Sequence, residues 1–251
     1  MFSTAHQDLK TQVVNACLEI FPEATSVILW GGSVTPDFSP AVNDIDVIIE
    51  IDLDFSQEVV LAERLKALIS ITSFCRLDPF VYLTEGNPEE PLEFIAPFGF
   101  YKANPFIPYL LQNQHEVVFG QSRLLKRLPE VPLQQALTGI LPAAMGALKR
   151  LRMDVQSEGA WAPIAAKHKA SLFVVLRTYF AYENGGVGSK KESLRFLEKQ
   201  MPQFTPILNQ IWLNLEIDRT PPKDEPSLEL VLDFVKTLES YFVSKRYPNA
   251  N

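Results

Sequence analysis

The chain has 251 residues and a formal net charge of −7. With 47% hydrophobic and 21% charged residues, its composition is that of a globular protein large enough for one large or two modest domains. The acidic balance disfavours general electrostatic binding to nucleic acid, and no apolar run approaches the roughly 20 residues needed to cross a membrane.

Cysteines are rare in the chain, which contains only Cys17 and Cys75, both in apolar surroundings. We therefore expect buried free thiols and a reducing, cytoplasmic location. The first ten residues show no basic segment followed by an apolar core, so no signal peptide is expected. With three histidines and no Cys/His cluster, a structural zinc site is not expected either.

The first predicted elements are a helix and two strands. Residues 6–20 carry apolar side chains at helical spacing. The apolar run at 27–30 predicts a short strand, which Gly31-Gly32-Ser33 interrupts. Residues 34–43 predict a loop, and 42–51 predict a second strand rich in β-branched residues.

The second predicted strand contains two acids, Asp44 and Asp46. Residues i and i+2 of a strand point to the same face, so we expect the two carboxylates side by side. Such a pair is costly unless a cation lies between them, and Mg²⁺ binds one or two carboxylates together with substrate phosphates. The glycines allow close approach of the main chain, and Ser33 can offer its hydroxyl and N–H to a phosphate. The pattern predicts a site for a nucleoside triphosphate and its metal ions.

This combination resembles the Gly-Ser…Asp-x-Asp signature of the nucleotidyltransferase superfamily, which has a polymerase β-like fold. Gly32, Ser33, Asp44 and Asp46 match that signature in the expected strand context. Either half alone would be a weak signal, because most Asp-x-Asp pairs are solvated surface carboxylates. The resemblance implies an α+β fold with an N-terminal mixed sheet and flanking helices, ATP as a substrate, and Mg²⁺.

The next strand candidate, at 74–83, follows a helical pattern at 56–71 with Ser56 as its expected N-cap, so a βαβ-like unit is expected. Within this strand, Asp78 has the position of the superfamily's third carboxylate. The resemblance implies that Asp78 completes the metal site or takes the proton from the attacking hydroxyl. On the residues alone, Asp78 followed by proline also fits an ordinary strand start.

Two other acids, Asp52 and Asp54, continue the alternation of the second strand, but we expect them to point to solvent. Residues 84–108 are rich in proline, glycine and aromatic residues, which predicts short strands and loops. Some of these aromatic residues are candidates for a wall of an acceptor pocket, although packing against the sheet is the more ordinary role. A further element at 115–120 is similar to one that follows the sheet in this family, and its lone His115 is expected to be structural.

A proline-bounded segment at 129–132 suggests a domain boundary, giving domains 1–130 and 131–251. The second domain is predicted to be an all-helical bundle, with helical patterns at 133–153, 164–182, 190–200, 202–215 and 227–245 and a loop at 156–163. Gly185 suits a helix C-cap, and Ser189 with Glu192 predicts a capping box.

A nucleotidyltransferase sheet followed by a helical domain resembles the aminoglycoside adenylyltransferases of the streptomycin/spectinomycin type. In that family an Arg on one helix and a Lys thirteen residues later reach the ATP phosphates, and Arg177 and Lys190 match this spacing. On the residues alone, Arg177 equally suits an internal pair with Glu183 or Glu239, and Lys190 suits a solvated helix start. Lysine at a helix N-terminus is unfavourable to the helix dipole, which favours a functional reason.

Two departures from this family concern the acceptor. Lys167 stands where the family has an acidic contact to the aminoglycoside, and a lysine would repel a polycation. Asp154, Glu158 and Glu183 are candidates to compensate. Asp78 is also shorter than the glutamate that the drug-modifying enzymes tend to use.

The sequence thus predicts a Mg²⁺-dependent enzyme that transfers AMP from ATP to a hydroxyl of a small, aminoglycoside-like acceptor. The predicted catalytic and metal-binding residues are Asp44, Asp46 and Asp78, and the predicted nucleotide-binding residues are Gly32, Ser33, Arg177 and Lys190. One alternative is adenylylation of a protein partner, as in antitoxins that modify their toxin. Another is a non-catalytic nucleotide-binding module. DNA polymerisation is disfavoured by the acidic charge and the lack of a basic stripe.

Overall fold

The structure is a computed structural model that describes residues 4–36, 38–39, 44–52, 57–84, 92–213 and 225–246. The chain divides into two compact units, Met1–Pro132 and Leu133–Asn251, so the division lies two residues beyond the boundary expected from the sequence. Each unit has its own hydrophobic core. In the part of the chain that the structure describes, no helix is long and apolar enough to cross a membrane.

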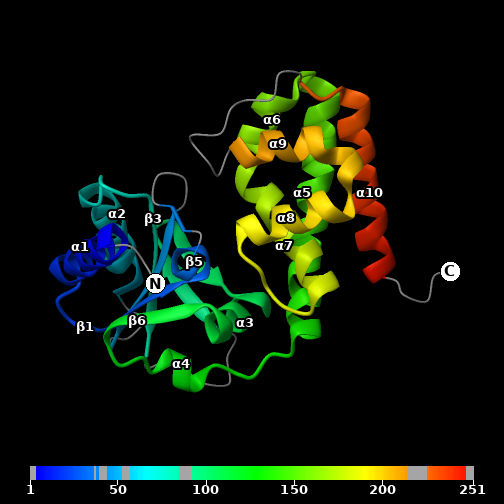
Figure 1. Cartoon of the computed structure of the whole chain (residues 1–251). Coiled ribbons are helices and arrows are strands. Elements are labelled where there is room, and N and C mark those ends of the chain that lie inside the picture. Colours follow the sequence, from blue (N-terminus) through cyan, green and yellow to red (C-terminus); the bar gives the residue numbers. More distant parts are fainter. Residues whose placement is uncertain are drawn as a thin grey trace. The chain divides into compact units, whose positions relative to one another are not determined.

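Unit 1 is built on a six-stranded mixed sheet in the order β5-β4-β3-β2-β1-β6 (Figure 1). Strands β2 and β3 are parallel and are joined by helix α2, which confirms the predicted βαβ-like unit, while the other neighbouring strands are antiparallel. The elements of unit 1 are α1 (Thr4–Ile20), β1 (Ala24–Trp30), the 3₁₀ turn η1 (Gly31–Val34), β2 (Ile45–Ile51), α2 (Glu58–Ile71), β3 (Leu77–Leu83), β4 (Glu93–Ala96), β5 (Gly99–Lys102), α3 (Phe106–Asn113), β6 (His115–Gly120) and α4 (Leu124–Arg127).

The two faces of the sheet differ in chemistry. One face packs against α1 and α2 and forms the core of unit 1, whose buried members include Val13, Cys17, Leu29, Val47, Ile49, Leu61, Leu65 and Val81. Strands send alternate side chains to opposite faces. The residues between these aliphatic positions, among them Trp30, Asp46 and Asp78, therefore lie on the opposite face. The core face holds the sheet together and leaves the other face available for polar and aromatic groups.

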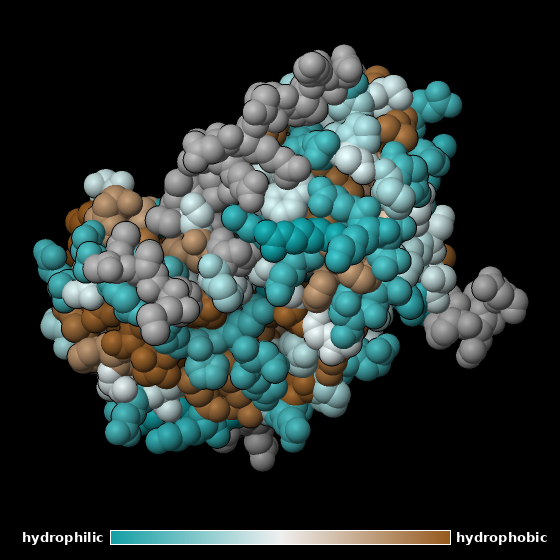
Figure 2. All heavy atoms as spheres, in the orientation of Figure 1, coloured by the Kyte–Doolittle hydropathy of each residue, from teal (hydrophilic) through white to brown (hydrophobic). Residues whose placement is uncertain are grey.

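Strand β6 is an open edge of the sheet in unit 1. Its residues Val117 and Phe119 are exposed. Figure 2 shows that hydrophobic side chains gather on the surface of unit 1, at the lower left of the view, beside hydrophilic ones. The cysteine prediction holds for Cys17, where burial raises the pKa of the thiol to about 12. It is wrong for Cys75, which is only half-buried.

The described residues of unit 2 form helices and their connections, as predicted. They are α5 (Leu133–Glu158), α6 (Trp161–Lys167), α7 (Lys169–Asn184), α8 (Lys190–Gln200), the 3₁₀ turn η3 (Pro202–Phe204), α9 (Thr205–Leu213) and α10 (Leu228–Arg246). Their apolar faces enclose a core whose largest buried side chains are Trp161, Phe204, Phe234 and Phe242. The predicted caps are present. Gly185 ends α7 in the left-handed conformation, and Ser189 forms a capping box with Glu192 at the start of α8.

Several predicted boundaries in the helices were wrong. Helix α5 continues to Glu158 and ends before Gly159, which has φ 79°, so the predicted loop at 156–163 starts too early. The predicted helix at 164–182 is two helices that break at His168, where the backbone has φ −96° and ψ 14° and the ring is hydrogen-bonded to Asp154 of α5. Helix α2 starts at Glu58, and the predicted N-cap Ser56 lies outside the described residues.

Candidate active site

Three carboxylates lie at the amino ends of β2 and β3. Asp46, the second residue of β2, pairs with Asp78, the second residue of β3, across the parallel ladder. Asp44 comes directly before β2, so it lies just outside the strand in which it was expected. Because the two strands run parallel, their amino ends share one edge of the sheet. The structure thus places the three acids that the sequence singled out at the same edge.

The electrostatics of this edge favour a proton or a cation. Asp78 reaches solvent, but the protein around it removes part of its hydration, which raises the pKa of the carboxyl group. The negative charge of Asp44 raises this pKa further. Repulsion of this kind is unfavourable in a folded protein unless a ligand uses it.

The turn that faces these acids depends on Gly31 more than on Gly32. Gly31 has φ 64°, a left-handed conformation that favours glycine, and a Cβ there would lie 2.9 Å from Oδ2 of Asp46. At Gly32, a Cβ would meet no atom within 4 Å. The N–H of Gly31 donates to the carbonyl oxygen of Gln114, 3.0 Å away. The sequence analysis expected the glycines to let the main chain approach a ligand. In the structure it is Gly31 that makes a close approach, and its neighbour is the Asp46 carboxylate.

Ser33 occupies the centre of the turn, but its hydroxyl is used inside the protein. The residue is 1% exposed, and its Oγ–H donates to the carbonyl oxygen of Trp30 at 2.7 Å. In the free protein this hydroxyl is therefore bonded within the turn, and its predicted contact with a phosphate stays a prediction. The bond fixes the 3₁₀ turn at the end of β1. Of the loop predicted at 34–43, residues 37 and 40–43 lie outside the described part of the chain.

An aromatic cluster continues from the carboxylates across the same face of the sheet. Phe80 of β3 lies 6.2 Å from Trp30, 6.0 Å from Phe94 and 5.6 Å from Tyr101, measured between ring centroids. Burial raises the pKa of Tyr101, and the negative charge of Asp78 raises it further, so the Tyr101 ring lies near the carboxylates. These aromatic residues pack against the sheet, as expected for most of the 84–108 segment, and they form one side of the carboxylate edge.

Helix α1 brings His6 to the turn and Lys10 to the neighbouring strand β6, two contacts that the sequence analysis missed. The His6 ring is hydrogen-bonded to the main chain of Ser33 and lies 5.0 Å from the ring of Phe38. Lys10, one helical turn further on, is 4% exposed and is paired with Glu116 of β6. In sequence this helix shows only an apolar periodicity, so no local signal marks its contact with the turn.

The rival acids of the second strand do not belong to this edge. Asp52 follows the carboxyl end of β2, where it accepts hydrogen bonds from Thr84 Oγ1 at 2.7 Å and from Arg123 Nη1 at 3.2 Å. These donors hold the pKa of Asp52 below its ordinary value. Asp52 is exposed, in agreement with the prediction. Asp54 lies outside the described residues.

In unit 2, the predicted phosphate-binding residues Arg177 and Lys190 lie close to one another in the fold. Arg177 on α7 is half-buried, and its Nε donates to the carbonyl oxygen of Gly188 at 3.0 Å, next to the start of α8. Lys190 is the first residue of α8, and its Nζ lies 5.4 Å from the centroid of the Phe173 ring. The two acids considered as partners of Arg177 have other bonds. Glu239 binds Arg152, whereas Glu183 binds Tyr241 and Lys245.

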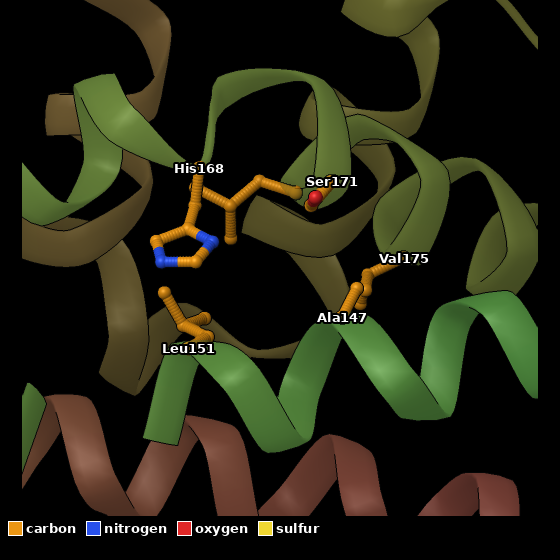
Figure 3. Close-up of a pocket in the computed structure, with 6 residues that line it drawn as sticks. Ala147, Leu151, His168, Ser171 and Val175 are labelled. Carbon is orange, nitrogen blue, oxygen red and sulfur yellow. The ribbon is translucent and has the colours of Figure 1, made fainter. Parts of the chain in front are cut away.

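Lys167 is paired with an acid of its own unit. Its Nζ lies 2.9 Å from Oδ2 of Asp154, and the same oxygen lies 2.6 Å from Nε2 of His168. Both neighbours lower the pKa of Asp154. His168 also lines a small hollow between α5 and α7, in which its ring lies beside Leu151 and across from Val175 (Figure 3). Of the three acids considered as compensation for Lys167, the structure pairs Asp154 with it.

The donor set at the carboxylate edge fits magnesium. Among the residues that the structure describes, no three His, Cys, Asp or Glu side chains gather closely enough to hold a metal ion by themselves. Magnesium does not require such a cage, because it is commonly bound by one or two carboxylates together with substrate phosphates and water. Asp44 and Asp46 supply hard oxygen ligands of this kind. Oδ2 of Asp46 lies next to the turn, 2.9 Å from where a Cβ at Gly31 would stand.

Comparison with known proteins gives one informative result. No family model matches the chain, and no curated protein matches it by sequence. Among solved structures, the chain is similar to spectinomycin adenyltransferase AAD(9) from Enterococcus faecialis, determined with ATP and spectinomycin. The TM-score is 0.62 at 12% sequence identity, over 92% of this chain and 99% of that chain. At this identity the similarity shows the fold alone, and we conclude that the chain shares the α+β fold of that adenyltransferase, the fold class that the sequence predicted.

Proposed function

We propose that the chain is a magnesium-dependent adenylyltransferase that transfers AMP from ATP to a hydroxyl of a small, aminoglycoside-like molecule. The observation that carries this proposal is the row of Asp44, Asp46 and Asp78 beside the Gly31 turn, at one edge of the sheet. The fold similarity supports it, since the similar structure is an adenyltransferase determined with ATP and spectinomycin.

Asp44 and Asp46 are the residues that we propose hold magnesium. Bound there, the ion would neutralise phosphate charge and align the triphosphate for in-line attack. Asp78 is the third carboxylate, and its raised pKa makes it a stronger base than an ordinary aspartate. We therefore propose that Asp78 accepts the proton of the acceptor hydroxyl. As the hydroxyl oxygen bonds to the α-phosphorus, the bond from that phosphorus to the β-phosphate oxygen breaks, and pyrophosphate leaves.

The triphosphate is assigned to main-chain and cationic groups. We propose that the main chain of the turn at Gly32 and Ser33 contacts the phosphates, because the Ser33 hydroxyl is already bonded to Trp30. Arg177 and Lys190, which lie close together at the start of α8, are the proposed cations for the β- and γ-phosphates.

The proposed acceptor is aminoglycoside-like, and the pairing of Lys167 bears on this. A lysine whose charge is matched by Asp154 at 2.9 Å repels a cationic acceptor less than an unpaired one. The half-buried ring of Tyr101, which lies near Asp78 and packs on the buried Phe80, offers an aromatic surface for a cyclic acceptor.

The experiment that tests the proposal measures pyrophosphate release from ATP with Mg²⁺. Wild type and Asp46→Asn are compared with streptomycin, with spectinomycin and with a cell extract as the source of acceptor. We expect release that requires one acceptor and disappears in the variant. Release that requires a protein fraction of the extract would replace the small-molecule acceptor with a protein acceptor. ATP binding without release under any condition would favour the non-catalytic module.

A further inference from the structure

His6 stands next to the triphosphate turn, and the chemistry proposed above does not use it. We propose that His6 is a nucleotide-binding residue that is neutral in the free protein and takes up a proton when a triphosphate binds at the turn. This inference rests on the proposed function of the turn of Gly31, Gly32 and Ser33.

Contacts place the His6 ring at the turn. It is hydrogen-bonded to the main chain of Ser33, the residue that fixes the 3₁₀ turn. On the chain that leads away from the turn, Phe38 lies 5.0 Å from the His6 ring at an angle of 59° between the ring planes. Phe38 itself packs against the core of unit 1. The imidazole is thus held between the turn and the segment that follows it, and it remains partly accessible to solvent.

The charged groups around His6 explain why it is neutral without a ligand. Burial is the largest effect and lowers the pKa of His6, and the positive charge of Lys10 on the same helix lowers it further. Glu116 of β6 and the main chain of Ser33 act in the opposite direction but do not reverse the shift. Lys10 is itself buried and paired with Glu116, so the negative charge of Glu116 is already matched. A histidine with a pKa below its ordinary value is largely uncharged at about pH 7.

A bound triphosphate changes this balance. Its negative charges favour the protonated imidazole, and an opposite charge within about 4–6 Å shifts a pKa by roughly 1–3 units. His6 then becomes a cation at the moment when an anion is present. Without nucleotide, the neutral ring avoids placing a second positive charge beside the buried ammonium group of Lys10. The protein therefore gains a phosphate-binding cation without the cost of carrying it in the free state.

The test is calorimetric titration of the full chain with ATP and Mg²⁺ at about pH 7, in two buffers of different ionisation enthalpy. The difference between the two buffers gives the number of protons bound per ATP. We expect uptake of a substantial fraction of one proton by the wild type. In His6→Gln, which keeps a hydrogen-bonding side chain for the main chain of Ser33, we expect this uptake to disappear and ATP binding to weaken several-fold.

The matched control is His115→Gln, which removes the exposed histidine of β6. It should leave proton uptake unchanged. Equal uptake in wild type and His6→Gln, or a loss confined to His115→Gln, would overturn the inference and leave the proposed function standing. No ATP binding by the wild type would overturn the proposed function, and the inference with it. An NMR titration of the wild-type histidines with and without ATP gives a readout that does not depend on the folding of a variant. One histidine pKa should rise when ATP is added, and three unchanged values would contradict the inference.

Discussion

The two ends of strand β2 carry acids in opposite circumstances. At the carboxyl end, Glu50 is 0% exposed, and its carboxylate accepts hydrogen bonds from the Ser122 hydroxyl and from the N–H groups of Arg123 and Leu124. Asp52, next to it, is bonded by a hydroxyl and a guanidinium. At the amino end, Asp44 and Asp78 raise the local negative charge and Asp46 faces the Gly31 turn.

This difference is the one expected between acids that stabilise the fold and the acids that we propose bind a metal. Glu50 is surrounded by donors that satisfy it, so its burial stabilises the fold. At the amino end the charge of Asp44 acts on Asp78, a repulsion that is unfavourable by itself and that suits a cation. Both ends of the strand carry acidic side chains, and only the groups around these side chains differ.

The largest expected effect concerns catalysis at the amino end. Asp46→Asn should lower the rate of AMP transfer by on the order of a hundred- to a thousandfold, because it removes an anionic ligand of the proposed metal. Asp52→Asn, a change of the same kind at the other end, should keep the activity within a few-fold of wild type. Rates with saturating ATP and acceptor measure both, and thermal unfolding checks that the variants fold. Equal loss in the two variants would contradict the division between the ends.

At the carboxyl end the expected effect is on stability. Glu50→Ala should lower the free energy of unfolding by about 3 kcal/mol, because it leaves the buried Ser122 hydroxyl, the buried N–H of Leu124 and the part-buried N–H of Arg123 without their acceptor. Urea unfolding followed by circular dichroism measures this. The control is Glu63→Ala on α2, whose exposed side chain should contribute within about 0.5 kcal/mol. A cost for Glu50→Ala no larger than that of the control would show that Glu50 is not structural.

A smaller effect on stability is expected at the turn. Gly31→Ala should cost roughly 1–2 kcal/mol for the left-handed backbone. The contact with the Asp46 carboxylate, 2.9 Å from the new Cβ, adds to this cost. Gly32→Ala should cost less, because a Cβ there meets nothing within 4 Å. Unfolding curves of the two variants, measured side by side, test the assignment, and the reverse order of stability would refute it.

The smallest effect concerns acid sensitivity at Asp52. Its folded-state pKa is lowered by Thr84 and Arg123, so its contribution to stability is present above the unfolded pKa of about 4 and is lost as the pH falls through the folded value. Wild type should therefore be slightly more stable than Asp52→Asn at neutral pH, and the difference should close below about pH 4. Urea unfolding at a series of pH values measures this difference in stability. A difference that widens on acidification would contradict the prediction.

Much of the architecture was predictable because its signals are local. The apolar periods of the helices, the capping box of Ser189 and Glu192, and the C-cap at Gly185 each depend on residues within one turn of one another. The carboxylate edge was predictable in part for the same reason. A strand containing Asp44 and Asp46 and a later strand opening with Asp78 meet at one edge once a βαβ-like unit is assumed.

The remaining features depend on contacts between residues far apart in the sequence. The break at His168 coincides with its bond to Asp154 of another helix, whereas its own segment shows an unbroken helical period. The need for glycine at Gly31 arises from the Asp46 carboxylate. The place of His6 at the turn depends on how α1 packs on the sheet. None of these has a local pattern that distinguishes it from an ordinary helix or turn residue.

The position of β6 has a consequence for how the protein is made. Strand β1 leaves the ribosome early, but its outer neighbour, β6 at His115–Gly120, is synthesised only after all the other strands. Until then β1 is an unpaired edge of buried, β-branched residues, the kind of segment that associates with other chains. Completion of β6 is thus the step that covers the open edge of β1. Truncations that end before residue 120 are expected to aggregate more than those that end after unit 1, because only the longer chains can pair β6 with β1.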